Sequence, residues 1–495
     1  MRVSLRKAVL AIALAAAPLG ASAQTLEIAT DASPSGLDPH VATAFATILV
    51  NGNLYEGLTA IDKDLRVVPS LAESWSVSPD QLTYTFKLRA GVIFHDGQTM
   101  TAKDVTASID RVLDKATGSP IASRFNMIAS SAADASGFVI KLTEPSAPFL
   151  AQLSGLAILP ATHGDLARTA VGTGPFKLVE WVPDTYLRLA KHDQYWEKGL
   201  PKLAALKINI VPEASTRQVG IASGTYHMIP TLDAQTALTL KGNANVRLIQ
   251  AQDLAYTLIG LNVSKPPFDN AKVREAVNVA IDRGKVVQAA YFGQGVAGGP
   301  LSPALTDWAT PVDKFSCYKP DAAKAKALLK DAGIAGELAV TINVLGSIQV
   351  VKDVARVVQA ELNQAGFKAS LNVQEQGKFI QDWRNSAFEA FASTNGGNVD
   401  PDDYLNRTFR TGGSTNVFKY SNAGLDKLLD DGRRTTDKAQ RQKIYTEAQQ
   451  VLACQGPISH VAYGTLFTAV RSNVKGYELI ATRSTRYLRE TSLDK

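Results

Sequence analysis

The side chains best suited to chemistry are scattered along this chain rather than clustered. The six histidines stand far apart, and no two have the spacing of a zinc-binding helix. They are His40, His95, His163, His192, His227 and His460. No segment matches the nucleophile motif of a serine hydrolase. The sequence therefore predicts no catalytic residue, no metal site and no cofactor.

One glycine-rich segment satisfies the dinucleotide-binding pattern GxGxxG, but it lacks the required context. The segment runs from Gly293 to Gly298. The pattern needs a strand before it and a helix after it, because the helix N-terminus binds the pyrophosphate. Here a helix is expected before the segment, and Gly299-Pro300 stands where the phosphate-binding helix would begin. We therefore interpret the segment as a loop.

The two cysteines, Cys317 and Cys454, are too few for a structural metal site. In an oxidising compartment an isolated pair of cysteines favours a disulfide. Because it closes a long loop, such a disulfide would stabilise the folded protein by roughly 3 to 5 kcal/mol in the chain-entropy model. The alternative is two buried free thiols.

The N-terminal residues predict export. Arg2, Arg6 and Lys7 precede an apolar run over residues 8–19 and the small residues 21–23, which is typical of a secretory signal peptide over residues 1–23. The apolar run is shorter than the roughly 20 residues that a membrane-spanning helix needs. No cysteine follows the cleavage point to carry a lipid anchor. We expect a periplasmic protein without an anchor.

Length and composition indicate a globular protein of about three structural domains. The 495 residues are 45% hydrophobic and 20% charged. The formal charge of +6 includes the three positive charges of the signal peptide, so the mature chain carries 6 − 3 = +3. Because no basic run or basic-aromatic motif is present, we expect no nucleic-acid partner.

Local patterns predict a mixed α/β fold. Residues 26–29 and the alternating residues 84–88 read as strands, and residues 176–182 with 186–191 read as a hairpin. Thr101 and Asp104 form a capping box that begins a helix. Further helices are expected from Asp269 to a stop at Gly284 and from Asp321 to Gly333.

The most legible unit is a strand, helix, strand crossover in the C-terminal half. Apolar residues alternate over residues 338–344, repeat at helical spacing over 351–362, and alternate again over 367–373. Such a crossover implies two parallel strands in one sheet.

Several recognisable motifs follow one another along the chain. The N-terminal motifs lie at residues 54–58, 71–75, 84–89 and 94–97. Later motifs lie at residues 172–176, 267–269, 318–321 and 474–477. Together, and in this order, they resemble the family 5 extracytoplasmic solute-binding proteins of ABC importers, which bind dipeptides, oligopeptides or nickel. The resemblance covers essentially all of the mature chain.

The resemblance implies a two-lobed periplasmic binding protein fold of type II, cluster C, with an extra subdomain inserted in lobe I and a two-segment hinge. It places the lobe I core at residues 24–64, 172–262 and 473–495, the inserted subdomain at 65–171, and lobe II at 263–472. Two crossing strands near Asn262 and Val474 would join the lobes. A ligand that contacts both lobes would drive closure.

In peptide-binding members of the family, a loop after a lobe II strand supplies a tryptophan and an aspartate that pairs with the peptide ammonium. Anchored on Asp400-Pro401, those positions fall at Thr394 and Gly397. Asp400, or else Asp402 or Asp403, could replace the missing carboxylate. The loop otherwise offers hydroxyl, amide and backbone groups. The predicted ligand-binding residues here are Thr394, Asn395, Gly396, Gly397, Asn398 and Asp400.

Four residues outside the loop complete the predicted site. Arg384, beside Trp383, could clamp a ligand carboxylate, although an arginine on a solvated helix face is the alternative. Tyr463 lies in a segment that lines the family's cleft, and Asp38 lies in a lobe I loop where it could instead cap its own turn.

These features predict a monomeric, non-enzymatic protein that hands its ligand to the permease and ATPase subunits of an ABC importer. A peptide or peptide-like conjugate is the first expectation. Because of Thr394 and Gly397, a non-peptide solute such as an opine, an oligosaccharide or a metal chelate stays open. A periplasmic hydrolase is the alternative from another class, since paired carboxylates cannot be recognised in one sequence.

Overall fold

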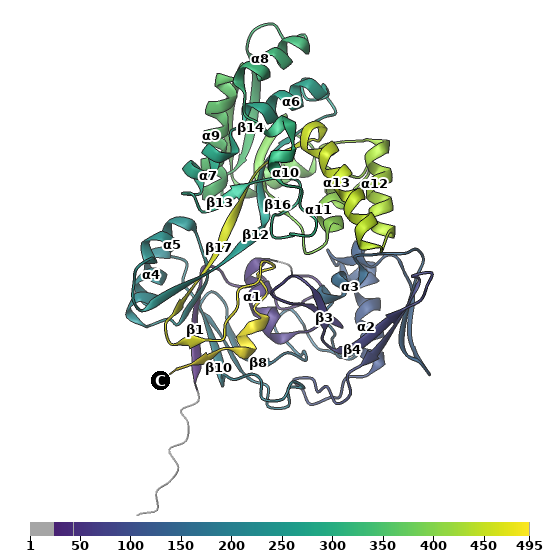
Figure 1. Ribbon diagram of the computed structural model, residues 1–495. Coiled ribbons are helices and arrows are strands. Elements are labelled where there is room, and N and C mark those ends of the chain that lie inside the picture. The colour runs from purple at the N-terminus through teal and green to yellow at the C-terminus, as the bar shows by residue number, and fades with distance from the viewer. Residues whose placement is uncertain (1–23, 43, 495) are drawn as a thin grey trace, which may run out of the picture.

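The computed structural model describes residues 24–42 and 44–494. The predicted signal peptide, residues 1–23, lies outside the described residues. Two lobes are stacked one above the other, and two long strands run between them (Figure 1). These strands are β12 (Val246–Leu261) and β17 (Ile458–Arg471). The mixed α/β, two-lobed architecture expected from the sequence is confirmed.

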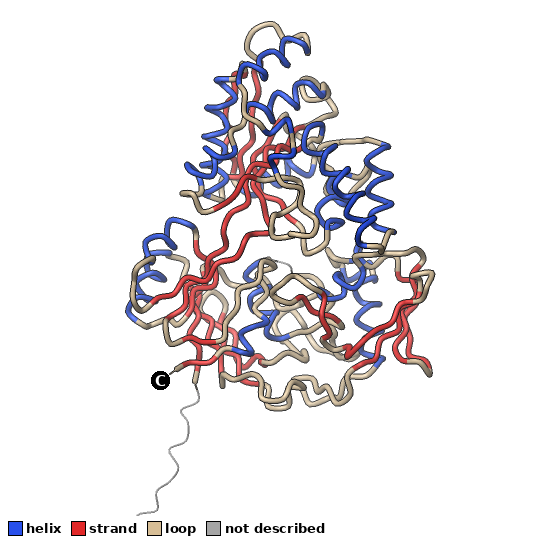
Figure 2. Tube along the Cα trace, in the orientation of Figure 1, coloured by secondary structure: helices blue, strands red, loops and turns tan. Residues whose placement is uncertain are grey.

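A single sheet passes through both lobes. Within the described residues it has eleven strands in the order β15-β14-β16-β12-β17-β11-β1-β10-β9-β8, with β13 added beside β17. Figure 2 shows this sheet as a continuous red band from one lobe to the other. The two lobes are therefore joined by continuous, hydrogen-bonded strands.

Lobe I, the lower lobe in Figure 1, is built on the end of this sheet that runs from β11 to β8. Its strands are β1 (Thr25–Thr30), β8 (Phe176–Val182), β9 (Tyr186–Lys191), β10 (Ala205–Ile210) and β11 (Met228–Leu232). Its helices are α1 (Phe45–Leu54), α4 (Ala214–Ser223) and α5 (Ala234–Leu240). β1 pairs in parallel with β10, and β8 with β9 forms the predicted hairpin.

A second sheet, with its own hydrophobic core, lies at the side of lobe I. Its four strands have the order β4-β5-β7-β6. The region comprises β2 (Thr59–Ile61), β3 (Val67–Pro69), β4 (Ala72–Val77), β5 (Thr83–Leu88), α2 (Ala102–Leu113), β6 (Ile128–Asp134), β7 (Gly137–Leu142) and α3 (Phe149–Gln152). The predicted capping box begins α2, because the Thr101 and Asp104 side chains each accept a hydrogen bond from the backbone N–H of the other residue.

Lobe II carries the rest of the main sheet, covered by helices. Its strands are β13 (Gly295–Ala297), β14 (Leu338–Leu345), β15 (Phe367–Gln374) and β16 (Ala390–Gly396). Its helices are α6 (Ala271–Ala280), α7 (Arg283–Ala290), α8 (Ala322–Asp331), α9 (Gln349–Gln364), α10 (Gln376–Arg384), α11 (Pro401–Phe409), α12 (Ala423–Arg434) and α13 (Lys438–Gln455). The predicted crossover is confirmed as β14, α9 and β15, with the two strands parallel.

The expected end of the helix at Gly284 was wrong. α6 ends at Ala280, and a new helix, α7, begins after its N-cap Asp282, whose side chain accepts from the Lys285 N–H. Gly284 lies inside this second helix, because the N-cap Asp282, two residues after the end of α6, restarts the helical hydrogen bonds. The segment 293–298 follows α7 and supplies β13, which pairs with β17.

Cys317 and Cys454 form a disulfide, as expected for an exported pair. The bond joins the segment before α8 to the last turn of α13. Both cysteines pack against the core of lobe II, so the bond ties the segment before α8 and the end of α13 to one core. No helix in the described part of the chain is long and apolar enough to cross a bilayer.

The strands that link the lobes are paired over most of their length, and their register breaks between Gln252 and Tyr256. Asn262 and Val474, the expected crossing points, lie at the two ends of this paired stretch: Asn262 bonds to lobe II backbone and Val474 packs in the lobe I core. We propose the residue boundaries implied by the resemblance for the two lobes and for the inserted subdomain.

Candidate ligand-binding cleft

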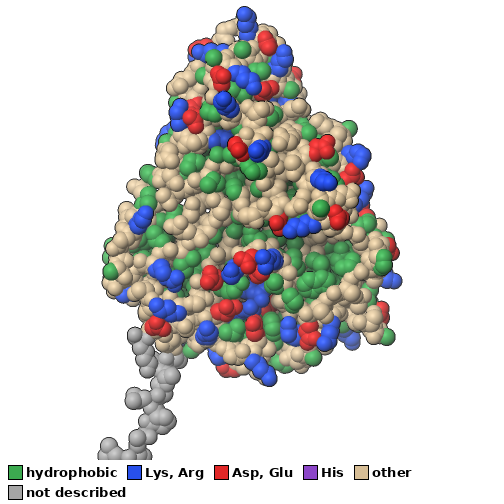
Figure 3. Space-filling model, viewed as in Figure 1, with side chains coloured by type: hydrophobic (Ala, Val, Ile, Leu, Met, Phe, Trp, Pro, Cys, Tyr) green, Lys and Arg blue, Asp and Glu red, His purple; other side chains and the backbone are tan. Residues whose placement is uncertain are grey.

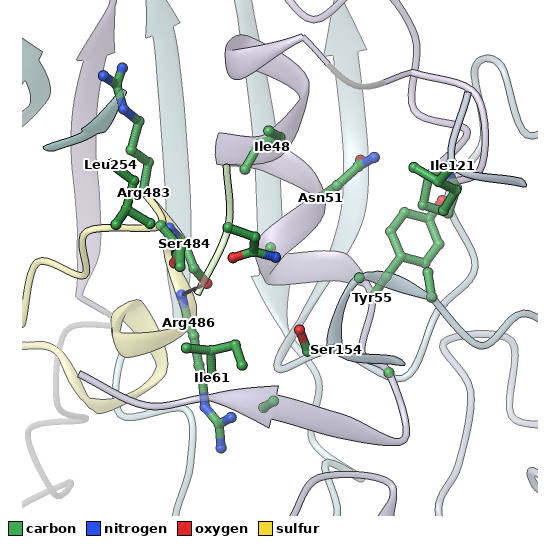
Figure 4. Close-up of a pocket in the computed structure, with 18 of the residues that line it drawn as sticks. Ile48, Asn51, Tyr55, Ile61, Ile121, Ser154, Leu254, Arg483, Ser484 and Arg486 are labelled. Atoms are coloured by element: carbon green, nitrogen blue, oxygen red, sulfur yellow. Dashed lines mark hydrogen bonds between the residues drawn. The ribbon is translucent and has the colours of Figure 1, made fainter. Parts of the chain in front are cut away.

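The two lobes enclose a cavity of about 680 Å³. Lobe I lines it with α1, with the segment from Tyr55 to Ile61, and with residues 481–489 near the C-terminus. Lobe II lines it with Leu254 and Ala255 of β12, with the end of β16 and with the loop after it. In the close-up, the chain segment that bears Arg483 and Arg486 lies beside α1 (Figure 4). The cavity therefore draws its surface from segments more than 400 residues apart.

The structure brings the predicted loop to this cavity. The five residues that line it are Thr394, Asn395, Gly396, Gly397 and Asn398. Arg407 of α11 holds the loop in place, because its guanidinium donates to the Asn395 side chain at 3.0 Å and to the Gly396 carbonyl. Thr394 is exposed, whereas Asn395 is committed to Arg407 and to its neighbour's backbone N–H.

Three carboxylates follow the loop, and only one of them lines the cavity. Asp400 accepts two hydrogen bonds of 2.7 Å from Arg441, and Asp402 accepts two from Arg433, at 3.1 and 2.7 Å. Asp403 lines the cavity and is 8% exposed. Asp400, the predicted ligand-binding residue, is outside the cavity and already paired. Its side chain also caps α11 by accepting the Asp402 N–H.

Gly397 stands at the position where the resemblance implies an aspartate, and the space for a side chain is filled. A Cβ at Gly397 would lie 2.3 Å from the ring of Tyr404. Tyr404 is buried on α11, and its hydroxyl donates to the Leu254 carbonyl at 2.8 Å. This close approach of the ring, not an unusual backbone angle, requires glycine at position 397.

Trp383 and Arg384, at the end of α10, do not line the main cavity. Trp383 lines a smaller pocket of about 280 Å³, which shares Thr394, Asn395 and Arg407 with the main cavity. Arg384 is exposed on α10, as expected for an arginine on a solvated helix face and not for one that clamps a ligand. The structure therefore does not bring Arg384 to the cleft.

Tyr463 and Asp38 also lie outside the main cavity. Tyr463 is fully buried in β17, where its hydroxyl donates to the Gly299 carbonyl at 3.1 Å. Asp38 accepts the His40 N–H at 3.0 Å and forms an ion pair with Arg111. Both side chains make structural contacts, and neither lines the main cavity.

Arginines from both lobes line the cavity, and their partners differ. Arg483 forms an ion pair of 2.6 Å with Asp253, a buried carboxylate whose pKa is raised by desolvation. Arg489 pairs with Glu197 at 2.8 Å. Arg486 has no ion pair among residues 24–42 and 44–494, and its buried Nη1 atom has no acceptor there.

A buried carboxylate supports the floor of the cavity. Glu56 accepts hydrogen bonds from Tyr195 at 2.7 Å, Trp196 at 2.9 Å and Thr173 at 3.0 Å. Burial raises the pKa of Glu56, and these three donors lower it. Because its lone pairs are used by donors of lobe I, Glu56 holds the floor together.

The sequence missed several residues of the cleft. Arg124, Arg407 and Arg486 lie far apart along the chain, and no motif marks them. Asp403 was named only as a substitute for the missing aspartate. The sequence around Asp400, Asp402 and Asp403 does not show which of the three carboxylates is unpaired. The arginines that pair with the other two come from helices that are distant along the chain.

Comparisons with known proteins agree with this architecture. A model of bacterial extracellular solute-binding proteins, family 5 Middle, matches residues 66–416. The glutathione-binding protein GsiB of Pectobacterium atrosepticum is 29% identical, over 94% of this chain and 93% of that protein. The dipeptide-binding protein of Escherichia coli K12 is 29% identical, over 96% and 97%.

The fold is similar to that of a solved structure with a bound peptide. The ABC transporter-associated periplasmic binding protein DppA of Helicobacter pylori, in complex with the peptide STSA, has a TM-score of 0.82. It is 27% identical, and the alignment covers 95% of this chain and 98% of that one.

Proposed function

The chain belongs to the bacterial extracellular solute-binding proteins of family 5, and from this premise we propose that it captures a short peptide or a peptide-like amino-acid conjugate in the periplasm. It then delivers that ligand to the permease of an ABC importer. The relatives named above are binding proteins, and we propose that this chain likewise binds its ligand without chemical change.

The observation that carries the proposal is the cavity between the lobes. Its volume of about 680 Å³ lies within the range of roughly 300 to 1,000 Å³ typical of small-ligand sites. Residues of both lobes line it, so a bound ligand contacts both and favours the closed arrangement. Carboxylates, guanidinium groups and backbone groups suit a ligand with the charges and amides of a short peptide.

We also propose that the protein acts as a monomer in the periplasm and binds no nucleic acid. Acidic and basic side chains are interspersed on the face shown in Figure 3, without a broad field of one sign. A mixed surface of this kind does not attract a polyanion.

A ligand screen tests the proposal. Thermal unfolding is measured with dipeptides, tripeptides and glutathione, and in parallel with opines, oligosaccharides and metal chelates. We expect stabilisation by peptides or glutathione, because a ligand that binds only the folded state raises its unfolding temperature. Stabilisation by the non-peptide compounds alone would replace the peptide assignment with the alternative solute class.

The same samples test the hydrolase alternative. Each stabilising compound is incubated with the purified protein and recovered for mass spectrometry. We expect the compound to be recovered intact, and any hydrolysis product would contradict a function of binding alone.

A further inference from the structure

We propose that Asp403 and Arg486 anchor opposite ends of a zwitterionic ligand, Asp403 binding its ammonium group and Arg486 its carboxylate. This inference rests on the proposed function and names the groups that the ligand must carry. The predicted carboxylate position, Gly397, holds no side chain, so the ammonium partner has to come from another place.

Asp403 differs from its two neighbours in what surrounds its carboxylate. Asp400 and Asp402 each face an arginine, and both are neutralised within lobe II. The Asp403 carboxylate has no hydrogen bond or ion pair to any residue that the structure describes, although the side chain is only 8% exposed. A buried carboxylate without a partner costs several kcal/mol. A cation entering the cavity removes that cost.

Arg486 provides the complementary cation on lobe I. It lies in the 3-10 helix Arg486–Glu490, at the start of a short turn that also carries Arg489. Arg489 is paired with Glu197, and Arg483 with Asp253, but Arg486 is paired with no described carboxylate. Burial and the nearby Arg489 lower the pKa of Arg486, so an anion at this position restores a favourable environment.

The two groups belong to opposite lobes and form no ion pair with each other in the structure. Both line the same cavity, so a ligand whose positive and negative ends bind these two groups contacts both lobes at once. This arrangement links recognition to closure, because a ligand shifts the equilibrium only through contacts that the open state lacks.

Other charges also face Asp403 and affect its ionisation. Arg124 from lobe I, and Arg407 and Arg433 from lobe II, attract a negative charge there, while Asp400 opposes it. Burial outweighs these effects and raises the pKa of Asp403. An ammonium group that binds the ionised carboxylate displaces this proton, so its apparent affinity should rise as the pH rises above the ordinary range of an aspartate.

Calorimetry with one tripeptide in three forms tests the proposal. The probes are Ala-Ala-Ala, its N-acetylated form and its C-terminal amide, each titrated into wild type, Asp403→Asn and Arg486→Met. For wild type we expect each blocked form to bind about 30-fold to 1,000-fold more weakly than the free peptide. Asp403→Asn should abolish the penalty of N-acetylation, and Arg486→Met that of amidation.

Asp402→Asn is the matched control, because this carboxylate lies one residue away and is already paired with Arg433. It should lower the unfolding temperature while wild-type discrimination between the three probes persists. Circular dichroism establishes that each variant is folded.

The outcomes separate the inference from the proposed function. Binding of the tripeptide to wild type with equal affinity for blocked and free forms, or unchanged discrimination in the two variants, would overturn the inference alone. If wild type bound none of the three tripeptides and no peptide in the ligand screen, both the peptide function and the inference would fall.

Discussion

Asp400, Asp402 and Asp403 lie within four residues of one another, and the structure gives them different tasks. Asp400 is held by Arg441 and Asp402 by Arg433, in pairs that are largely shielded from solvent. Asp403 faces the cavity. The arginines, not the carboxylates themselves, therefore decide which of the three is free to bind a ligand, and removing an arginine should have a large effect.

Arg441→Met should destabilise the protein strongly. The variant leaves the Asp400 carboxylate buried without its partner, and a broken buried pair costs about 3 to 5 kcal/mol. Urea-induced unfolding monitored by circular dichroism measures the change. Lys427→Met is the control, because its pair with Asp431 is exposed and is worth less than about 0.5 kcal/mol. Similar losses in the two variants would contradict the assigned role of Arg441.

Glu361 on α9 gives a prediction about pH. One carboxylate oxygen accepts the Asp282 N–H at 3.0 Å, and the other has no partner among the described residues. Burial raises the pKa of Glu361 from 4.5 to about 7, opposed by the Asp282 N–H and by Lys285 and Arg283. The folded state therefore favours the protonated form, so this contribution to stability is present at low pH and is lost as pH rises through about 7.

Glu361→Gln should remove this dependence. The variant is expected to match wild type near pH 4 and to be more stable at pH 8, by roughly 1 to 3 kcal/mol. Denaturant unfolding at both pH values measures the difference. A wild-type protein that is no less stable than the variant at pH 8 would refute the assignment.

At the scale of elements, the cleft depends on how α11 packs under the loop that follows β16. Tyr404 of α11 covers Gly397 and bonds to β12, while Arg407 bonds to Asn395 and Gly396. The helix thus positions the end of β16 and the loop after it through two side chains, one aromatic and one charged.

Gly397→Ala should disturb this packing. The added methyl group would overlap the Tyr404 ring, and overpacking of this kind costs about 1 to 3 kcal/mol. We expect lower stability and weaker ligand binding, measured by thermal unfolding and calorimetry. Gly164→Ala is the control, because a Cβ there meets no atom within 4 Å. If the Gly397 variant behaved like the control, the contact with Tyr404 would not fix the loop.

At the scale of the whole molecule, the lobes touch at the rim of the cleft as well as through the linking strands. The Ala147 N–H donates to the Arg433 carbonyl at 2.8 Å, and Glu144 pairs with Arg434 at 2.9 Å. Val399 of lobe II packs with Ile61 and Ala151 of lobe I. These contacts hold the two lobes together on one side of the cleft. They stabilise the closed arrangement in addition to the contacts of a bound ligand.

Glu144→Ala should weaken closure slightly. The pair is exposed, so we expect its loss to raise the dissociation constant of a bound peptide by no more than about five-fold, with less effect at high salt. Calorimetry at low and high salt measures the affinity, and small-angle scattering measures the ligand-induced compaction. An identical scattering profile with and without bound ligand would contradict closure.

The sequence by itself determined the local elements and the class of protein. The Thr101 capping box, the hairpin at residues 176–191 and the crossover from β14 to β15 each depend on neighbouring residues, so their patterns can be read directly. The disulfide was expected from export and from the cysteine count. The family followed from motifs spread over the whole mature chain.

Only the tertiary structure decided which groups face the ligand. Asp400 and Asp403 have the same side chain and nearly the same place in the sequence, but Arg441, 41 residues after Asp400, neutralises one and not the other. Arg486 meets the cleft through a C-terminal segment that returns to α1. Charge pairing and close packing act between residues that are distant along the chain, and for this physical reason a local pattern does not reveal them.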